Sequence, residues 1–270
     1  MQPRHTSHFS RSYTSFGFLI LALLLMVIFG LALSKGAVPL SMIAIFDGSA
    51  SSLETTVFNQ LRAPRVFLSA TVGASLAVSG AVLQGLFRNP LADPGLIGVS
   101  GGAALGAVAM IVFGSSLALP EVVTPYSLPV AAILGAMVVT LFLYSFSAYY
   151  GQFSVVTVLL AGIAINALST VGIGVFQYLS DDAQLRTLVF WMMGSFGRAN
   201  WITVLPSTFV MLVGVVILIF HSRQLDRLQL GEAEAFYLGV KVNRLKRVII
   251  LVSAVCVGAG VALSGIIGFV

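Results

Sequence analysis

The sequence predicts an all-α protein, a polytopic transmembrane bundle of about seven helices. Hydrophobic residues make up 58% of the 270 residues and charged residues only 9%, whereas soluble domains carry about 25% charged residues. The mean hydropathy is +1.03. The few charged residues fall in clusters, so the intervals between the clusters can be taken directly as candidate membrane spans. This composition is that of a membrane protein.

The charge-free intervals define the expected helices, because about 20 apolar residues cross a bilayer. The interval over 122–180 is long enough for two helices, with ends indicated by Pro125, Pro129, Tyr149, Tyr150 and Gly151. Residues 187–197 are too short to span a membrane and are expected at its interface. The predicted spans are 12–34, 66–87, 94–120, 128–148, 153–177, 199–222 and 248–270.

Basic residues indicate the orientation of these spans. Six of them crowd the loop at 223–247, which the positive-inside rule places in the cytoplasm. Six spans precede this loop, so the N-terminus, with Arg4 and Arg11, is expected on the same side. The pI of about 9.7 is explained by these topology signals, and we expect no nucleic-acid partner. Residues 1–270 are expected to form one transmembrane domain that contains this loop.

A polar stretch at 88–94 interrupts two long apolar runs, and we call it the inside turn. It holds Arg88, Asn89, Pro90, Asp93 and Pro94. Asp93 followed by Pro94 is typical of a helix N-cap and first helical position. Backbone without helical partners must be buried in protein at membrane depth, so we expect this turn to pack against other helices. A plain helical hairpin explains the same residues.

Small residues recur every four positions in two of the predicted spans. Gly98, Gly102 and Gly106 follow this spacing in the third span, and a stripe from Ser69 to Gly85 follows it in the second. Such spacing lets helix backbones approach closely in lipid, so the stripes predict tight packing.

The fifth span is the most polar one, because it contains Asn166 and Gln177. These side chains are candidates to line a path for a polar solute, although interhelical hydrogen bonding is the favoured explanation. All Asp and Glu residues lie outside the charge-free spans. A proton-coupled secondary transporter commonly carries an ionisable residue within the membrane, so this class is only the alternative.

The sequence contains no convincing catalytic motif. Ser100 lies in a GVSG pattern typical of intramembrane serine proteases, but His5, His8 and His221 lie on the N-terminal tail or at a span end, where they are poorly placed to act as its base. No glycine-rich loop ends in Gly-Lys-Ser or Gly-Lys-Thr, so there is no P-loop for ATP. The single cysteine, Cys256, fits no multi-cysteine site. We expect no catalytic residue, no metal site and no cofactor.

Two charged segments are candidate docking sites. Arg62 and Arg65, at the start of the second span, are expected outside and suit capture of carboxylates on a partner or of lipid phosphate. Inside the charged loop, Gly231 and Gly239 bracket a stretch that favours a short helix of mixed polarity. Such a helix fits a groove on another protein, or it lies on lipid headgroups, so membrane lipid is also an expected partner.

Four matches in order show that the chain resembles the FecCD family, the permease subunits of bacterial importers driven by ATP-binding cassettes. They are LRAPR at 61–65, GASLAVSGAVLQGLFRNPLADPGLIGVSGGAALGAV at 73–108, LGEAEAFYLGV at 230–240 and SGIIGFV at 264–270. The resemblance implies uptake of ferric siderophore, haem or cobalamin by alternating access, through a homodimer in the bacterial inner membrane. It also implies two ATPase subunits that hydrolyse the ATP and a substrate-binding protein as partners.

The resemblance also implies roles for particular residues. Arg62 and Arg65 are similar to arginines that pair with acidic residues on the binding protein, and the inside turn is similar to a turn near the cytoplasmic face. The segment that presses on the ATPase, called here the coupling segment (230–239), includes Leu230, Gly231, Glu232, Glu234, Ala235, Leu238 and Gly239. Members of the family usually have ten spans, so a chain that ends at Val270 is expected to be about three helices short.

Overall fold

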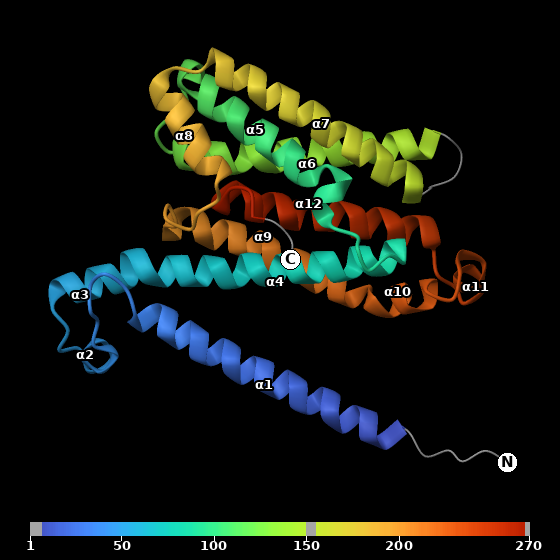
Figure 1. Ribbon diagram of the computed structural model, residues 1–270, viewed down its shortest axis with the longest axis horizontal. Helices are drawn as coiled ribbons and strands as arrows, with labels where there is room; N and C mark the ends of the chain where they lie inside the picture. Colours follow the sequence, from blue (N-terminus) through green and yellow to red (C-terminus); the bar gives the residue numbers. More distant parts are fainter. Residues whose placement is uncertain (1–6, 150–154, 268–270) are drawn as a thin grey trace. The chain divides into compact units, whose positions relative to one another are not determined.

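The computed structural model describes residues 7–149 and 155–267 of the chain, and every regular element within these two ranges is helical. The chain divides into two compact units, Met1–Phe67 and Leu68–Val270, which we call unit 1 and unit 2. Figure 1 labels the helices of both units. Each unit is described by itself.

Unit 1 begins with the long helix α1 (Ser7–Ser34), followed by the short helices α2 (Met42–Asp47) and α3 (Ser52–Thr56). Serines start both short helices: Ser41 accepts from the amide of Ala44, and Ser51 forms a reciprocal capping box with Glu54. The π-helical turn η1 (Val57–Arg62) then runs directly into α4 (Ala63–Phe87), which continues into unit 2.

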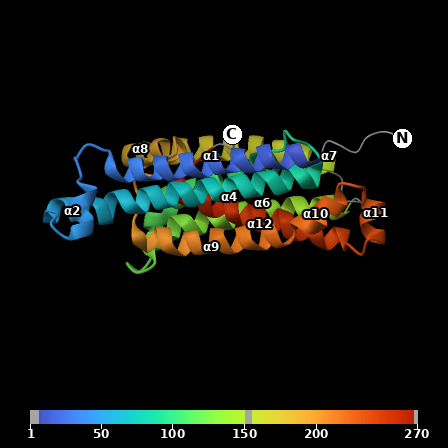
Figure 2. The ribbon, with the colours of Figure 1, turned by 90° about the horizontal axis from the view of Figure 1, so that it is seen from below.

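Unit 2 contains the rest of α4 and all later helices. They are the 3₁₀ turn η2 (Pro94–Ile97), α5 (Val99–Phe113), the 3₁₀ turn η3 (Gly114–Leu117), α6 (Thr124–Tyr149), α7 (Val155–Leu179), α8 (Asp182–Met192), α9 (Trp201–Phe220), α10 (Ser222–Leu228), α11 (Glu232–Tyr237) and α12 (Val242–Ser264). Figures 1 and 2 both place α10 and α11 at one end of this bundle, which we call the α11 end.

Seven helices of the described residues are long and apolar enough to cross a membrane, which confirms the predicted number of spans. The short piece predicted at 187–197 is the 11-residue helix α8, which begins earlier because Asp181 and Gln184 form a capping box. Its place at a membrane interface stays a prediction. The break predicted near residues 150–151 and the last predicted span residues, 268–270, lie outside the described residues.

The third and fourth spans begin at different residues from those predicted. The third was expected from residue 94, but Gly98 adopts a left-handed φ of +77°, ends the 3₁₀ turn and makes α5 begin at Val99. The fourth, α6, begins at Thr124, four residues before the predicted 128. Pro125 fits there, because the first turn of a helix has amides without helical partners.

Helix α12 is the central helix of unit 2. Of its most apolar stretch, 67% is buried, and it packs against α5, α6 and α9. Leu245, Ile249 and Val257 on α12 are each at most 1% exposed. The crossing helices α6, α7 and α9 keep large apolar side chains exposed, as expected for helices that contact lipid.

Glycines allow α5 and α6 to touch backbone to backbone. A Cβ added at Gly102 would lie 2.6 Å from the carbonyl oxygen of Gly135, and one added at Gly106 would collide with the carbonyl of Ala131. The small-residue stripe therefore packs tightly in α5, as predicted. In α4 the stripe is mixed: a Cβ at Gly85 would lie 2.8 Å from Cδ2 of Leu225, whereas one at Gly73 would meet nothing within 4 Å.

This difference predicts opposite effects of the same substitution at two helix-interior glycines. Gly135→Ala is expected to lower the free energy of unfolding by about 1–3 kcal/mol, because the new methyl group forces α5 and α6 apart. Gly73→Ala is the matched control, and it should be neutral or stabilising by up to about 1 kcal/mol. Unfolding midpoints in detergent measure both, and equal losses would contradict the close contact.

Candidate functional site

The inside turn and the segment before α11 meet at the α11 end of unit 2. The guanidinium of Arg88 donates to the carbonyl of Leu228 over 2.5 Å, although 140 residues separate the two. The side-chain amide of Gln229 donates in the return direction, to the carbonyl of Gly85 over 2.7 Å. The structure therefore brings together two sites that the sequence predicts separately.

The inside turn is closed by its own polar side chains. The carboxamide of Asn89 accepts from the amide of Leu91 over 2.9 Å, and the carboxylate of Asp93 accepts from the amide of Gly95 over 2.6 Å. Gln84 donates to the carbonyl of Pro90 over 2.9 Å. Asp93 is thus an N-cap as predicted, although it caps the 3₁₀ turn η2 rather than α5.

Burial divides the inside turn into two parts. Ala92 is 1% exposed and Pro94 is buried, as expected for a turn packed against other helices, whereas Leu91 is 81% exposed. Arg88 has a left-handed φ of +49°. This conformation costs a side-chain-bearing residue about 1 kcal/mol, and the bond to Leu228 holds it there.

The coupling segment forms the predicted short helix between two glycines. Gly231 and Gly239 have φ values of +137° and +81°, conformations that other residues rarely adopt. At the C-terminal end, the amide of Val240 donates to the carbonyl of Ala235 over 2.9 Å, and Gly239 donates to the carbonyl of Phe236 over 2.9 Å. This is a Schellman motif, which ends α11 sharply.

A partly buried ion pair ties α11 to the central helix. The ammonium of Lys246 on α12 lies 2.7 Å from the carboxylate of Glu232 on α11. The Lys246 side chain is 4% exposed and the Glu232 side chain 57% exposed. A buried ammonium without a counter-charge is costly, and the carboxylate of Glu232 offsets part of the cost of burying Lys246.

Apart from Glu234, the remaining exposed side chains of the coupling segment are apolar or aromatic. Ala235 is fully buried, whereas Leu230, Phe236, Tyr237 and Leu238 are 67%, 69%, 86% and 50% exposed. Sequence reasoning did not single out Tyr237, although its place beside Phe236 in a charged helix could have indicated an exposed aromatic pair. Exposed aromatic side chains are the usual anchors of protein interfaces.

The two arginines of unit 1 have different surroundings. Arg62 is half-buried, and its guanidinium donates to the carbonyls of Leu33 over 3.2 Å, Ser34 over 2.8 Å and Val38. It therefore satisfies the end of α1, where carbonyls have no helical partners. Arg65 is exposed on the first turn of α4. Their docking to a partner stays a prediction.

The two candidate pathway residues on α7 both contact other elements. The side-chain amide of Asn166 donates to the carbonyl of Gly95 over 2.8 Å, and Gln177 donates to the sulfur of Met192 over 3.9 Å. Both side chains therefore form hydrogen bonds to other elements, which is the explanation that the sequence analysis gave beside a solute pathway. A role in a solute pathway stays a prediction. Within the described ranges, no group of three His, Cys, Asp or Glu side chains could hold a metal ion.

Seven membrane-crossing helices and a short charged helix tied to the central helix of unit 2 define a class, the multi-pass helical membrane proteins. Comparison with known proteins then identifies the family. The chain matches the FecCD transport family over residues 22–270, and it belongs to this family. It is a membrane-spanning permease subunit of an importer driven by an ATP-binding cassette.

Relatives and a solved structure agree with this assignment. The chain is 44% identical over 254 residues to the hemin transport system permease protein HmuU of Yersinia pestis, covering 94% of this chain and 75% of the relative. It is 40% identical over 252 residues to the vitamin B12 import system permease protein BtuC of Vibrio vulnificus, covering 93% and 73%. An inward-facing structure of a metal-chelate type ABC transporter superposes with a TM-score of 0.81 at 36% identity, covering 93% and 76%.

These comparisons also bear on the alternative. An ATPase-independent secondary transporter is not favoured, because the family and the relatives are those of importers driven by ATP-binding cassettes.

The ion pair predicts unequal effects of removing its two members. Glu232→Gln leaves the ammonium of Lys246 buried without a counter-charge and is expected to lower the free energy of unfolding by about 2 kcal/mol. Lys246→Met leaves a carboxylate that water can reach, so it should cost less. Glu234→Gln is the control for the loss of one negative charge on α11. Unfolding midpoints in detergent measure all three, and equal values for Glu232→Gln and Glu234→Gln would contradict this role.

Proposed function

We propose that this permease works as a homodimer with two separate ATPase subunits and imports a large metal chelate, haem or an iron–siderophore complex. A binding protein outside the membrane delivers the substrate. The relatives' names support this substrate class, because they are permeases for hemin and vitamin B12 and a metal-chelate transporter. ATP hydrolysis belongs to the partner, and this chain contributes the moving bundle.

One observation carries the proposal: α11 is fixed to the bundle on one side and open on the other. Glu232 joins it to Lys246 on the central helix, and Ala235 is fully buried beneath it. Phe236 and Tyr237 are exposed and suit an apolar groove on the ATPase.

Mechanical coupling follows from these contacts. A displacement of α11 by the ATPase reaches α12 through the ion pair, and it reaches the inside turn through the bonds of Arg88 and Gln229. ATP binding and hydrolysis in the partner then bias the bundle between outward-facing and inward-facing states. The two positive-φ glycines give α11 sharp boundaries, so it moves as one short rigid helix.

The proposed orientation places the α11 end and the N-terminus in the cytoplasm of a bacterial cell, with the permease in its inner membrane. The basic loop at 223–247 supports this orientation. Arg65, which is exposed on the first turn of α4, then lies outside, where its charge suits an acidic surface of the binding protein. Arg62 has a structural role near this site, because its hydrogen bonds hold the end of α1.

The coupling role predicts the effect of truncating the exposed aromatic pair. Phe236→Ala combined with Tyr237→Ala is expected to weaken ATPase binding at least about tenfold, because the two rings are the largest exposed anchors of the segment. Substrate-stimulated ATPase activity should fall with it. Val122→Ala is the control, because this side chain is 81% exposed and lies in the loop that follows the far end of α5. Stimulation that persists after deletion of residues 232–239 would exclude the coupling role.

The docking role predicts a salt-dependent effect at Arg65. Arg65→Glu is expected to weaken docking of the binding protein about tenfold, and wild-type affinity should fall as salt is added. Arg223→Glu is the control, since it makes the same charge change at an exposed residue of α10. Arg62→Glu is also expected to destabilise unit 1, because it removes the hydrogen bonds to the end of α1. This variant is therefore assessed by its unfolding midpoint and not by its docking affinity. Unchanged affinity in the Arg65 variant would remove this residue from the interface.

A further inference from the structure

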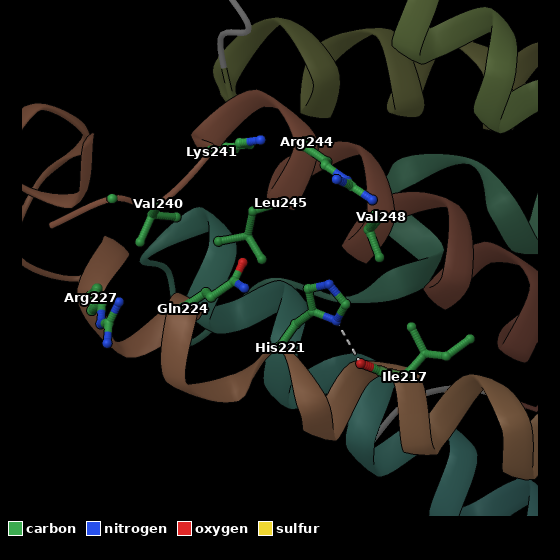
Figure 3. A pocket seen from close by; sticks show the side chains of 10 residues that line it. Ile217, His221, Gln224, Arg227, Val240, Lys241, Arg244, Leu245 and Val248 are labelled. Carbon is green, nitrogen blue, oxygen red and sulfur yellow. Dashed lines mark hydrogen bonds between the residues drawn. The ribbon is translucent and has the colours of Figure 1, made fainter. Parts of the chain in front are cut away.

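A basic pocket lies at the α11 end between the last turn of α9, α10 and the start of α12. Its volume is about 610 Å³, within the range of about 300–1,000 Å³ usual for small-molecule sites. The polar side chains that line it are His221, Gln224, Arg227, Lys241 and Arg244 (Figure 3). The transport proposal uses none of these side chains.

The pocket carries an excess of positive charge. Arg227, Lys241 and Arg244 supply three cations, and none of the ten residues that line the pocket is acidic. Among the described residues, none of these three cations lies within salt-bridge distance of a carboxylate. Arg227 is held toward α11 by a bond to the carbonyl of Leu238 over 3.3 Å.

The start of α12 adds to this preference for an anion. Helix α12 is 23 residues long, and its N-cap, Lys241, makes no side-chain bond to the first amides. The first amides of a helix and its dipole favour negative charge. His221 is fixed at the other wall by a bond of 2.8 Å between its Nδ1 and the carbonyl of Ile217 (Figure 3).

An apolar groove continues from the basic pocket along the seam of α9 and α12. This groove has a volume of about 280 Å³, is lined by apolar side chains and Gly214, and shares Ile217 with the basic pocket. Val248 lines the basic pocket, and Leu251 and Val252, three and four residues later, line the groove. These positions follow one another along one face of α12.

We propose that this site binds an anionic phospholipid, with its phosphate among Arg227, Lys241 and Arg244 and one acyl chain in the α9–α12 groove. Guanidinium and ammonium groups are the side chains that bind phosphate. The apolar groove decides between occupants, because a free phosphate or an acidic peptide leaves it empty whereas an acyl chain fills it. The chemistry is that of a basic pocket between helix ends at a membrane surface.

The position of the site gives the lipid a consequence for coupling. Gly239 and Val240, which join α11 to α12, also line the basic pocket. A bound headgroup therefore contacts the chain segment that joins α11 to the central helix, in addition to the proposed link through the ion pair. This consequence rests on the proposed function, whereas lipid binding itself does not.

Binding is tested on the purified full chain in mild detergent by native mass spectrometry, with titration of phosphatidylglycerol. The variant Lys241→Gln with Arg244→Gln is expected to bind phosphatidylglycerol about thirtyfold more weakly. Each cation near an anionic lipid contributes about 1 kcal/mol of binding free energy, and this variant loses two cations. Arg186→Gln with Arg223→Gln is the matched control, because it removes two cations that do not line the pocket and should leave affinity unchanged. Equal affinity of the pocket variant and wild type overturns the proposal.

Further binding experiments test whether the bound molecule is a phospholipid. Val213→Phe, which fills the groove, should weaken long-chain phosphatidylglycerol and leave a six-carbon-chain analogue unaffected. Phosphatidylcholine should bind weakly, and inorganic phosphate should not compete at equal concentration. Competition by phosphate, or by an acidic peptide, as strong as that by the lipid overturns the lipid assignment.

Photocrosslinking on the wild-type chain covers the case in which the pocket variant does not fold. A photoreactive phosphatidylglycerol should label residues 217–248, and labelling confined to other segments overturns the site. All these measurements use the chain without its ATPase. A failure of the coupling prediction is therefore distinguishable from a failure of lipid binding.

Discussion

Helix ends in a membrane protein leave backbone carbonyls that need a partner, and this constraint explains the roles of several polar side chains in an otherwise apolar chain. Several of them donate to carbonyls at a helix end or a turn, namely Arg62 to the end of α1, Gln84 to Pro90, Arg88 to Leu228, Asn166 to Gly95 and Gln184 to Val112. Within unit 2, these bonds give backbone carbonyls at the breaks between spans a hydrogen-bond partner.

The same bonds assemble the functional end of unit 2. Gln229 and Arg88 connect the segment before α11 to the inside turn, and the ion pair of Lys246 connects α11 to the central helix. A single cluster of polar contacts thereby serves two needs, satisfying the backbone and joining the surface that we assign to the ATPase with the buried core. Lipid-facing surfaces need no such contacts and are accordingly apolar.

Length and hydropathy were sufficient to predict the number and order of the spans, because crossing a bilayer imposes both on the sequence. The boundaries were less predictable: the left-handed Gly98 moved the start of α5, and Pro125 lies inside the first turn of α6 rather than before it. Gly231 and Gly239 correctly predicted α11. The partners of Arg62, Lys246 and Asn166 were not predictable, because they depend on residues far away in the sequence.

The unequal exposure of the ion pair has a consequence for assembly. Lys246 is enclosed by the bundle, whereas more than half of the Glu232 side chain is in contact with water. A subunit that covers Glu232 removes this water, and the attraction between the two charges grows as the local dielectric constant falls. If the ATPase covers Glu232 as proposed, the joint between α11 and α12 is stiffer in the assembled importer than in the lone permease.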